Sequence, residues 1–263
     1  MHRIVIINHY AGGPSYGMEF RTFYFAREWV KLGHSVLVIG ANVSHLRKRN
    51  PEVRGLVTSE EIDGVKYLWV RTPWYTENGV WRALNMFAFI AGLFTVCRSR
   101  IIRFAPDLVI ASSTYTFDNW PAAYYAKKTK ARYVYELHDL WPLTLIEVAG
   151  MSRRHPFVQI LQWAENFACR RADKVISLLP ATLPHLVAHG MRPDRFAYIP
   201  NGIVEDEWVL RQPVPQSHVE AIRLFKQKMR WLVGYVGGHN DLDPLEQMLE
   251  AGVSPDLADV GFV

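Results

Sequence analysis

The chain has 263 residues, of which 49% are hydrophobic and 21% are charged, and its formal net charge is +5 at neutral pH. This composition excludes a chain that is disordered throughout, and the length accommodates a substantial hydrophobic core. A modest positive charge suits anionic small molecules or an anionic membrane face better than extended nucleic acid, so we expect no nucleic-acid partner.

The thiols and the first residues indicate where the chain resides. Cys97 and Cys169 are the only cysteines and lack metal-ligand or redox spacing, which excludes a disulfide framework and indicates a reducing compartment. The apolar run at residues 4–7 is too short for the core of a signal peptide. We therefore expect a cytoplasmic protein.

Short β-branched runs alternate with segments of helical period, which is typical of an α/β fold with a doubly wound, Rossmann-like parallel sheet. The first strand, residues 3–8, precedes a glycine-rich loop, residues 11–17, and a helix over residues 18–32. Asp63–Gly64 predicts a tight hairpin turn. Further strands of this domain are expected at residues 35–40, 67–70, 107–111, 132–137, 174–178 and 196–199.

The pattern changes after residue 204, so residues 1–204 are predicted to form one complete domain. Residues 205–230 begin with a polar, proline-broken run and are predicted to be a linker or domain crossing. Residues 231–263 predict a single strand–helix–strand unit. Because one such unit cannot cover both faces of a parallel sheet, we expect an incomplete, truncated second Rossmann-like domain. Its elements are expected at residues 231–236, 242–250 and 258–263, with a turn at Gly237 and Gly238.

The glycine-rich loop is a candidate ligand site, because doubly wound sheets bind ligands at the carboxyl ends of their strands. Gly12, Gly13 and Gly17 allow backbone amides to approach an anion or a sugar. Their spacing does not fit the dinucleotide fingerprint, which disfavours a nicotinamide-dependent oxidoreductase. Glu19 and Arg21 are candidates for binding a polar ligand, and a solvated first helical turn is the alternative.

The most informative stretch is residues 135–142. A strand that ends in His138–Asp139 places an imidazole and a carboxylate at the carboxyl edge of the sheet, where they can polarise or position a reacting group. The alternative is a hydrogen-bonded core histidine at position 138 and a helix cap at Asp139. Glu136 lies on the same strand, so one of the two acids can point into the core.

Other motifs for metal binding and catalysis are weak. His185 and His189 are four apart on an expected helix, as in a two-histidine metal site, but no glutamate lies between them and no third ligand is obvious. A solvated helix face is the favoured interpretation, so we expect no metal. The chain has no G-x-S-x-G elbow and no Walker loop, which argues against serine-hydrolase and P-loop chemistry.

An uncharged stretch at residues 84–97 is flanked by arginines. It is shorter than the ~20 apolar residues of a spanning helix, so it either lies in a membrane interface or packs as a buried helix on the sheet. Basic groups at residues 47–49 and 127–132 would add attraction to anionic lipid.

Four motifs taken together resemble one family. In their order and spacing they are similar to the retaining glycosyltransferases of the GT-B fold, of the family-4 type, and the likeness covers essentially the whole chain. The runs 12–21 and 136–142 look closest to bacterial transferases of surface-polysaccharide assembly, including the N-acetylfucosamine transferase group. The four motifs are the glycine loop, Leu137–Asp139, Tyr198–Gly202 and Val233–Gly238.

This resemblance implies a two-domain enzyme that moves a sugar from a nucleotide-diphosphate sugar to a glycan or polyprenyl-linked acceptor, without a cofactor or an essential metal. It implies an acceptor-side domain followed by a donor-binding domain, with His138 near the transferred sugar and Asp139 beside it as the second catalytic candidate. The binding candidates that it implies are Gly12, Gly13, Gly17, Glu19, Arg21, Asn201, Gly202, Gly237 and Gly238.

Family members continue beyond the position of Val263 into a basic pair and a Glu-x7-Glu segment that hold the donor, and neither is present here. We therefore expect a glycosyltransferase that is weak or inactive by itself. The alternative is a non-catalytic module that binds an acceptor or a partner and contacts the cytoplasmic face of the inner membrane.

Overall fold

A computed structural model describes residues 1–17, 20–76, 79–209, 213–237 and 245–262. The chain divides into two compact units, Met1–Asn201 and Gly202–Val263. Each unit is described by itself below.

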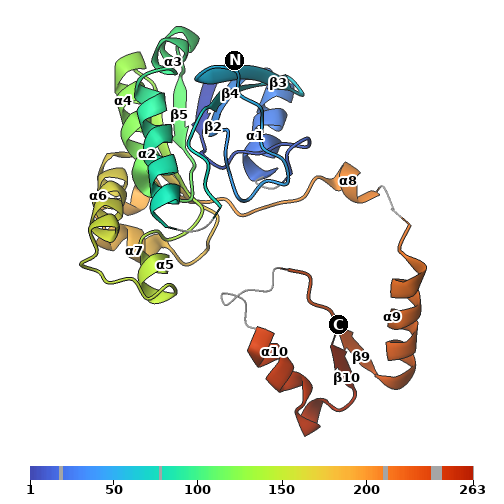
Figure 1. The fold of residues 1–263 in the computed structure, drawn as a ribbon. Coiled ribbons are helices and arrows are strands. Elements are labelled where there is room, and N and C mark those ends of the chain that lie inside the picture. Colours follow the sequence, from blue (N-terminus) through green and yellow to red (C-terminus); the bar gives the residue numbers. More distant parts are fainter. Residues whose placement is uncertain (18–19, 77–78, 210–212, 238–244, 263) are drawn as a thin grey trace. The chain divides into compact units, whose positions relative to one another are not determined.

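The first unit is built on an eight-stranded sheet with the order β3-β4-β2-β1-β5-β6-β7-β8 (Figure 1). Every strand pair is parallel except the β3–β4 hairpin. Asp63 and Gly64 close that hairpin with φ angles of 49° and 78°, as their sequence predicts. The doubly wound α/β fold is thereby confirmed. The strands are β1 (Arg3–Ile7), β2 (Ser35–Ala41), β3 (Val57–Ile62), β4 (Val65–Val70), β5 (Leu108–Ala111), β6 (Arg132–Leu137), β7 (Lys174–Ser177) and β8 (Phe196–Tyr198).

Helices cover both faces of this sheet, which explains why the central strands are runs of apolar residues and do not alternate with polar ones. Phe23 and Ala26 of α1 belong to one core, and Phe89, Tyr125 and Leu161 of α2, α4 and α6 belong to the other. The helices are α1 (Phe20–Lys31), α2 (Val80–Phe94), α3 (Arg98–Phe104), α4 (Asn119–Thr129), α5 (Leu143–Glu147), α6 (Pro156–Arg171) and α7 (Leu183–Ala188), with 3₁₀ turns η1 (Thr116–Asp118) and η2 (Pro193–Arg195).

The apolar stretch at residues 84–97 belongs in part to α2, which packs on the sheet, one of the two settings that its sequence allows. Met86, Phe89 and Leu93 of α2 are buried in the core, whereas Trp81 and Leu84 are 66% and 44% exposed. Within the described ranges no single helix has the length and hydropathy to cross a membrane. The helices α2 and α3 reach that length and hydropathy only when taken together, and the chain bends by 53° between them.

The second unit contains the predicted strand–helix–strand unit. β9 (Trp231–Val233) and β10 (Val260–Phe262) pair in parallel, with α10 (Leu245–Gly252) and the 3₁₀ turn η3 (Pro255–Leu257) between them in the chain. The segment predicted as a linker also holds two helices, α8 (Glu205–Val209) and α9 (Gln216–Lys228). Pro215 is the N-cap of α9, so the proline run marks the start of a helix.

Candidate functional site

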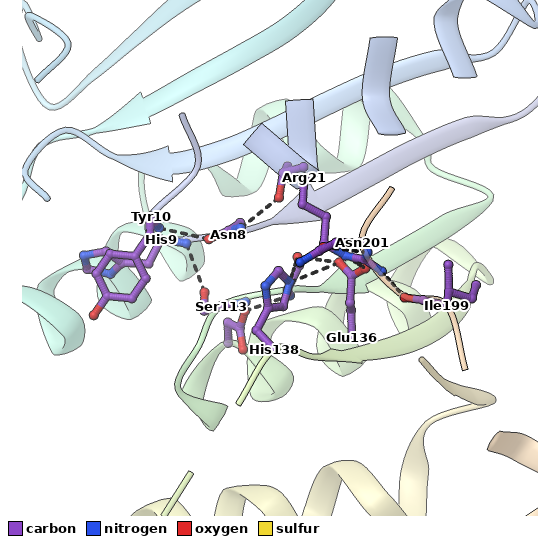
Figure 2. A network of polar contacts seen from close by, with 12 residues as sticks. Asn8, His9, Tyr10, Arg21, Ser113, Glu136, His138, Ile199 and Asn201 are labelled. Atoms are coloured by element: carbon purple, nitrogen blue, oxygen red, sulfur yellow. Dashed lines mark hydrogen bonds and ion pairs between the residues drawn. The ribbon is translucent and has the colours of Figure 1, made fainter. Parts of the chain in front are cut away.

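The candidate site lies at the carboxyl edge of the first unit's sheet. The strand order reverses at β1, which pairs with β2 on one side and β5 on the other. Ligands of doubly wound sheets bind at such a switch point. Figure 2 shows side chains from α1, from β6 and from the segments that follow β1, β5 and β8 converging there. We call the set Arg21, Ser112, Glu136 and His138 the carboxyl-edge network.

Glu136 is the centre of this network, and its side chain is 8% exposed. Its Oε2 accepts a hydrogen bond from Ser112 Oγ at 2.6 Å, and its Oε1 pairs with Arg21 Nε at 3.1 Å. Burial raises the pKa of the Glu136 carboxyl, but the hydrogen bond and charge of His138, the Ser112 hydroxyl and the charge of Arg21 outweigh burial and lower this pKa to about 2. Glu136 is therefore a buried carboxylate at neutral pH.

His138 follows β6 directly and is held by the same groups. Its Nε2 lies 3.0 Å from Ser112 Oγ and 3.4 Å from Glu136 Oε2. Because Ser112 gives its one hydroxyl proton to Glu136, Oγ accepts from Nε2–H, and this assigns a proton to Nε2. The imidazole is fixed in orientation at the sheet edge, with 11% of its side chain exposed.

Arg21 joins this edge to the first helix. Its guanidinium donates to the carbonyl oxygens of Ile199 and Pro200 at 2.8 and 2.9 Å and to Asn201 Oδ1 at 3.1 Å, besides pairing with Glu136. Its side chain is 9% exposed, so the solvated alternative considered from sequence is wrong for Arg21. Arg21 and Asn201, both predicted as binding residues, are thus brought together.

Asp139 has a different setting from His138. Its Oδ1 accepts from the Leu140 amide at 2.7 Å and from Thr144 Oγ1 at 2.8 Å, and its Oδ2 accepts from Trp141 Nε1 at 3.1 Å. These contacts stabilise the turn that leads into α5. The N-cap of α5 is Pro142, without a side-chain cap hydrogen bond, so the prediction of a helix cap at Asp139 is wrong.

Ser112 and Asp118 are functional candidates that sequence reasoning missed, although the Ser112–Ser113 pair follows a predicted strand. Asp118 Oδ2 accepts from the amides of Ser112 and Ser113 at 3.1 and 2.8 Å. Burial raises the pKa of Asp118 to about 7, against the lowering effect of those hydrogen bonds. Asp118 therefore positions the β5 loop that carries Ser112.

The polar residues that follow β1 are further site candidates that the sequence did not reveal. Asn8 Nδ2 donates to Thr22 Oγ1 at 2.8 Å, and the His9 amide donates to Ser113 Oγ at 3.0 Å (Figure 2). Burial, with the charges of Arg47 and Arg82, lowers the pKa of His9 well below its ordinary value. His9 is therefore a neutral core histidine beside the network.

Hydrogen bonds from β4 and within the loop itself hold the glycine-rich loop in place. Tyr67 Oη donates to the Gly12 carbonyl at 3.1 Å, and the carbonyl of Gly13 accepts from the amides of Tyr16 and Gly17. Gly12 and Gly13 are buried, whereas Gly17 is half-buried with a φ of +70°, a backbone conformation that favours glycine.

Arg47 supports the same loop, and this corrects one prediction. It is 6% exposed, and its guanidinium donates to the carbonyls of Ala11, His9 and Ala41 at 2.8, 3.2 and 2.6 Å. A side chain enclosed by backbone carbonyls does not reach lipid, so the prediction that Arg47 attracts anionic lipid is wrong. Lys48 and Arg49 beside it are exposed.

The remaining predicted site residues are placed as follows. Gly202 and Gly237 are exposed and belong to the second unit. Glu19 and Gly238 lie outside the described residues.

An apolar cavity of about 500 Å³ lies next to the 139–144 turn. Trp141, whose indole is bonded to Asp139, forms part of its wall, and Arg82 and His155 add polar groups. Its apolar lining includes Met86, Leu145, Met151 and Phe157.

The pair His185 and His189 is also placed differently from the prediction. His185 Nε2 lies 2.7 Å from Oε1 of Glu165, which is fully buried, so the pair faces α6 and the solvated-face interpretation is wrong. Glu165 is a third possible ligand that sequence spacing did not reveal, because it lies 20 positions away on another helix.

A glycosyl transferase 4-like domain matches residues 16–202 of the chain. The comparison with curated proteins yields no match. Among solved structures, Anabaena Alr3699/HepE in complex with UDP and glucose aligns with all of the chain at 16% identity and a TM-score of 0.55. A glycosyltransferase from Rickettsia africae ESF-5 aligns with 91% of it at 13% identity and a TM-score of 0.51. The chain spans 60% and 54% of the lengths of these two proteins, and the likeness shows a shared GT-B fold.

Proposed function

Since the chain belongs to the glycosyl transferase 4-like domain family, we propose that it transfers a sugar from a nucleotide-diphosphate sugar to an acceptor. The observation that carries this proposal is the fixed imidazole of His138 at the carboxyl edge of the sheet, held by Ser112 and Glu136. A histidine that is oriented by a buried carboxylate can position or polarise a reacting hydroxyl.

The roles of the groups follow from the charge that develops during transfer. Departure of a nucleotide diphosphate builds negative charge, which oriented amides and nearby cations stabilise. We assign this role to the glycine loop at Gly12 and Gly13, which precedes α1, and assign Gly17, whose amide donates to the Gly13 carbonyl, to shaping that loop. His138 is assigned to the transferred sugar or the acceptor hydroxyl, and Asp139, Glu136 and Arg21 are assigned as positioning residues.

The apolar cavity supports a lipid-linked acceptor. Its lining by Met86, Leu145 and Phe157 suits an alkyl or polyprenyl chain, and Trp141 connects its wall to the turn after His138. An acceptor held there by its lipid would present its sugar or phosphate toward the network. This agrees with the resemblance to transferases of bacterial surface-polysaccharide assembly.

The first test is the release of nucleotide diphosphate from a sugar donor by the purified protein. The chain spans 60% and 54% of the lengths of the two similar proteins, so we expect weak release. This release should depend on His138 and be unchanged by His218→Ala, since His218 is an exposed residue of α9. Equal release of nucleotide diphosphate by wild type and His138→Ala would show that His138 does not have the assigned role.

A second candidate function is a membrane-associated module that binds an acceptor without catalysis. The exposed stripe of α2 favours it, since Trp81, Leu84 and Ala91 lie at helical spacing on one face. The exposed Arg98, Arg100 and Arg103 follow this stripe and suit anionic lipid headgroups. Binding to vesicles without donor turnover would favour this function over transfer.

A further inference from the structure

We propose that Glu165, His185 and His189 bind one Zn²⁺ ion that joins α6 to α7. Each residue offers one ligand atom, and these three atoms lie within 4.8 Å of one another. Glu165 belongs to α6, His185 to α7, and His189 is the C-cap of α7. The site uses other elements than the carboxyl-edge network and is independent of the proposed transfer reaction.

Burial gives the first physical argument. The Glu165 side chain is fully buried, and a carboxylate in that setting needs a compensating charge. The group that faces its Oε1 is His185 Nε2, at 2.7 Å. A divalent cation between the two groups would balance the charge of the carboxylate.

The neighbouring side chains orient the three ligands. Gln162 Nε2 donates to Glu165 Oε2 at 2.7 Å and so leaves Oε1 to face the histidines. His189 Nδ1 lies 2.7 Å from Asn166 Oδ1, a hydrogen bond of the kind that fixes the tautomer of a metal-bound imidazole. Gln162, Glu165 and Asn166 lie three and four positions apart, so α6 presents them on one face.

The donor set selects the kind of metal. Two imidazole nitrogens and one carboxylate oxygen suit zinc, which accepts three protein ligands with water as the fourth. Mg²⁺ and Ca²⁺ prefer oxygen ligands alone. Ligand atoms about 2.1 Å from a tetrahedral zinc ion lie about 3.4 Å apart. The Glu165–His185 pair therefore has to open by less than an ångström to admit the ion.

Water has access to the fourth position, because 18% of the His185 side chain is exposed and His189 is half-buried. The two rings lie with their centroids 4.4 Å apart, so both can turn toward one ion. Because α6 and α7 are consecutive helices on either side of β7 in the chain, the ion would cross-link two helices that the chain itself joins only through this strand and its loops.

The test uses the full chain without a histidine tag, stripped with chelator and titrated with ZnCl₂ in a calorimeter. We expect one zinc ion per chain and a raised melting temperature. His185→Gln and His189→Gln should each weaken binding by at least ~10–100-fold, whereas His218→Gln in α9 should leave it unchanged. Equal zinc affinity in wild type and the double His185→Gln, His189→Gln variant would overturn the proposal.

Co²⁺ gives a second readout that does not depend on how well the variants fold. Bound to the wild-type chain, Co²⁺ should show the intense visible absorption of a four-coordinate site. Circular dichroism of the metal-free variants checks their folding. A weak, octahedral Co²⁺ spectrum of the wild type would contradict the site whatever the variants do.

Discussion

Arg21 Nε donates to Glu136 Oε1 at 3.1 Å and so links two residues that are 115 positions apart in sequence. This ion pair joins the first helix to the strand that precedes His138, and both side chains are less than a tenth exposed. Buried pairs of this kind define geometry more than they add stability. The position of the imidazole thus depends on a contact between the start and the middle of the first unit.

Replacing Arg21 tests this link. Arg21→Ala should destabilise the fold by about 3–5 kcal/mol, because it leaves the buried Glu136 carboxylate without the guanidinium that pairs with its Oε1. Arg153→Ala is the control, since Arg153 and its partner Glu147 are 70% and 58% exposed and such a pair contributes about 0–1 kcal/mol. Urea denaturation measures both variants, and a loss at Arg21 no larger than at Arg153 would contradict the assignment.

Glu136 should make stability depend on acid pH. Its pKa is lowered to about 2 in the folded chain, so the unfolded chain binds its proton first as pH falls. The stabilisation is present above about pH 4.5 and is lost as pH falls toward 2. Between about pH 4.5 and 2 the free energy of unfolding of wild type should fall by about 3 kcal/mol relative to that of Glu136→Gln. Denaturation curves at several pH values measure this, and a constant difference between the two proteins would disprove the shift.

Asp118 should have the opposite effect. Its pKa is raised to about 7, so the folded chain keeps a proton that the unfolded chain has already released above about pH 4. Wild type therefore loses stability as pH rises from about 4 to 7. Asp118→Asn keeps an acceptor for the Ser112 and Ser113 amides. Between about pH 4 and 8 the free energy of unfolding of this variant, relative to that of wild type, should rise by up to about 4 kcal/mol. Denaturation curves of both proteins at several pH values measure this difference, and a difference that does not change with pH would contradict the raised pKa of Asp118.

The exposed stripe of α2 should govern binding to anionic vesicles. Trp81→Asp and Leu84→Asp should reduce sedimentation with vesicles of anionic phospholipid, because both side chains are exposed. Phe87 and Phe94 are poorer probes, since Phe87 stacks on Phe117 and Phe94 packs against Tyr124 and Tyr125. Trp208→Asp in α8 is the control. Partitioning that is unchanged in both α2 variants would exclude this surface.

Sequence alone predicts the parts of this molecule that depend on local pattern. Apolar strands and the Asp63–Gly64 turn are readable because each needs only a few neighbouring residues. The position of His138 follows from its place after a parallel strand, because such strands share one carboxyl edge.

What the sequence does not reveal are pairings between distant residues. The Arg21–Glu136 ion pair and the Glu165–His185 contact depend on how helices dock on the sheet. Arg47 looks like a surface charge in the sequence, yet four backbone carbonyls enclose it in the fold. Such long side chains bury their charge only where tertiary structure supplies acceptors.

Donor turnover with and without His138 tests the central claim most directly. The full chain is incubated with UDP-glucose and a polyprenyl-linked saccharide in detergent, and UDP release is followed for wild type, His138→Ala and the His218→Ala control. We expect weak UDP release by wild type and the control, and a ~10²–10⁴-fold slower rate for His138→Ala at unchanged folding. The same measurable rate of UDP release in all three proteins would contradict the assignment of sugar transfer to this site.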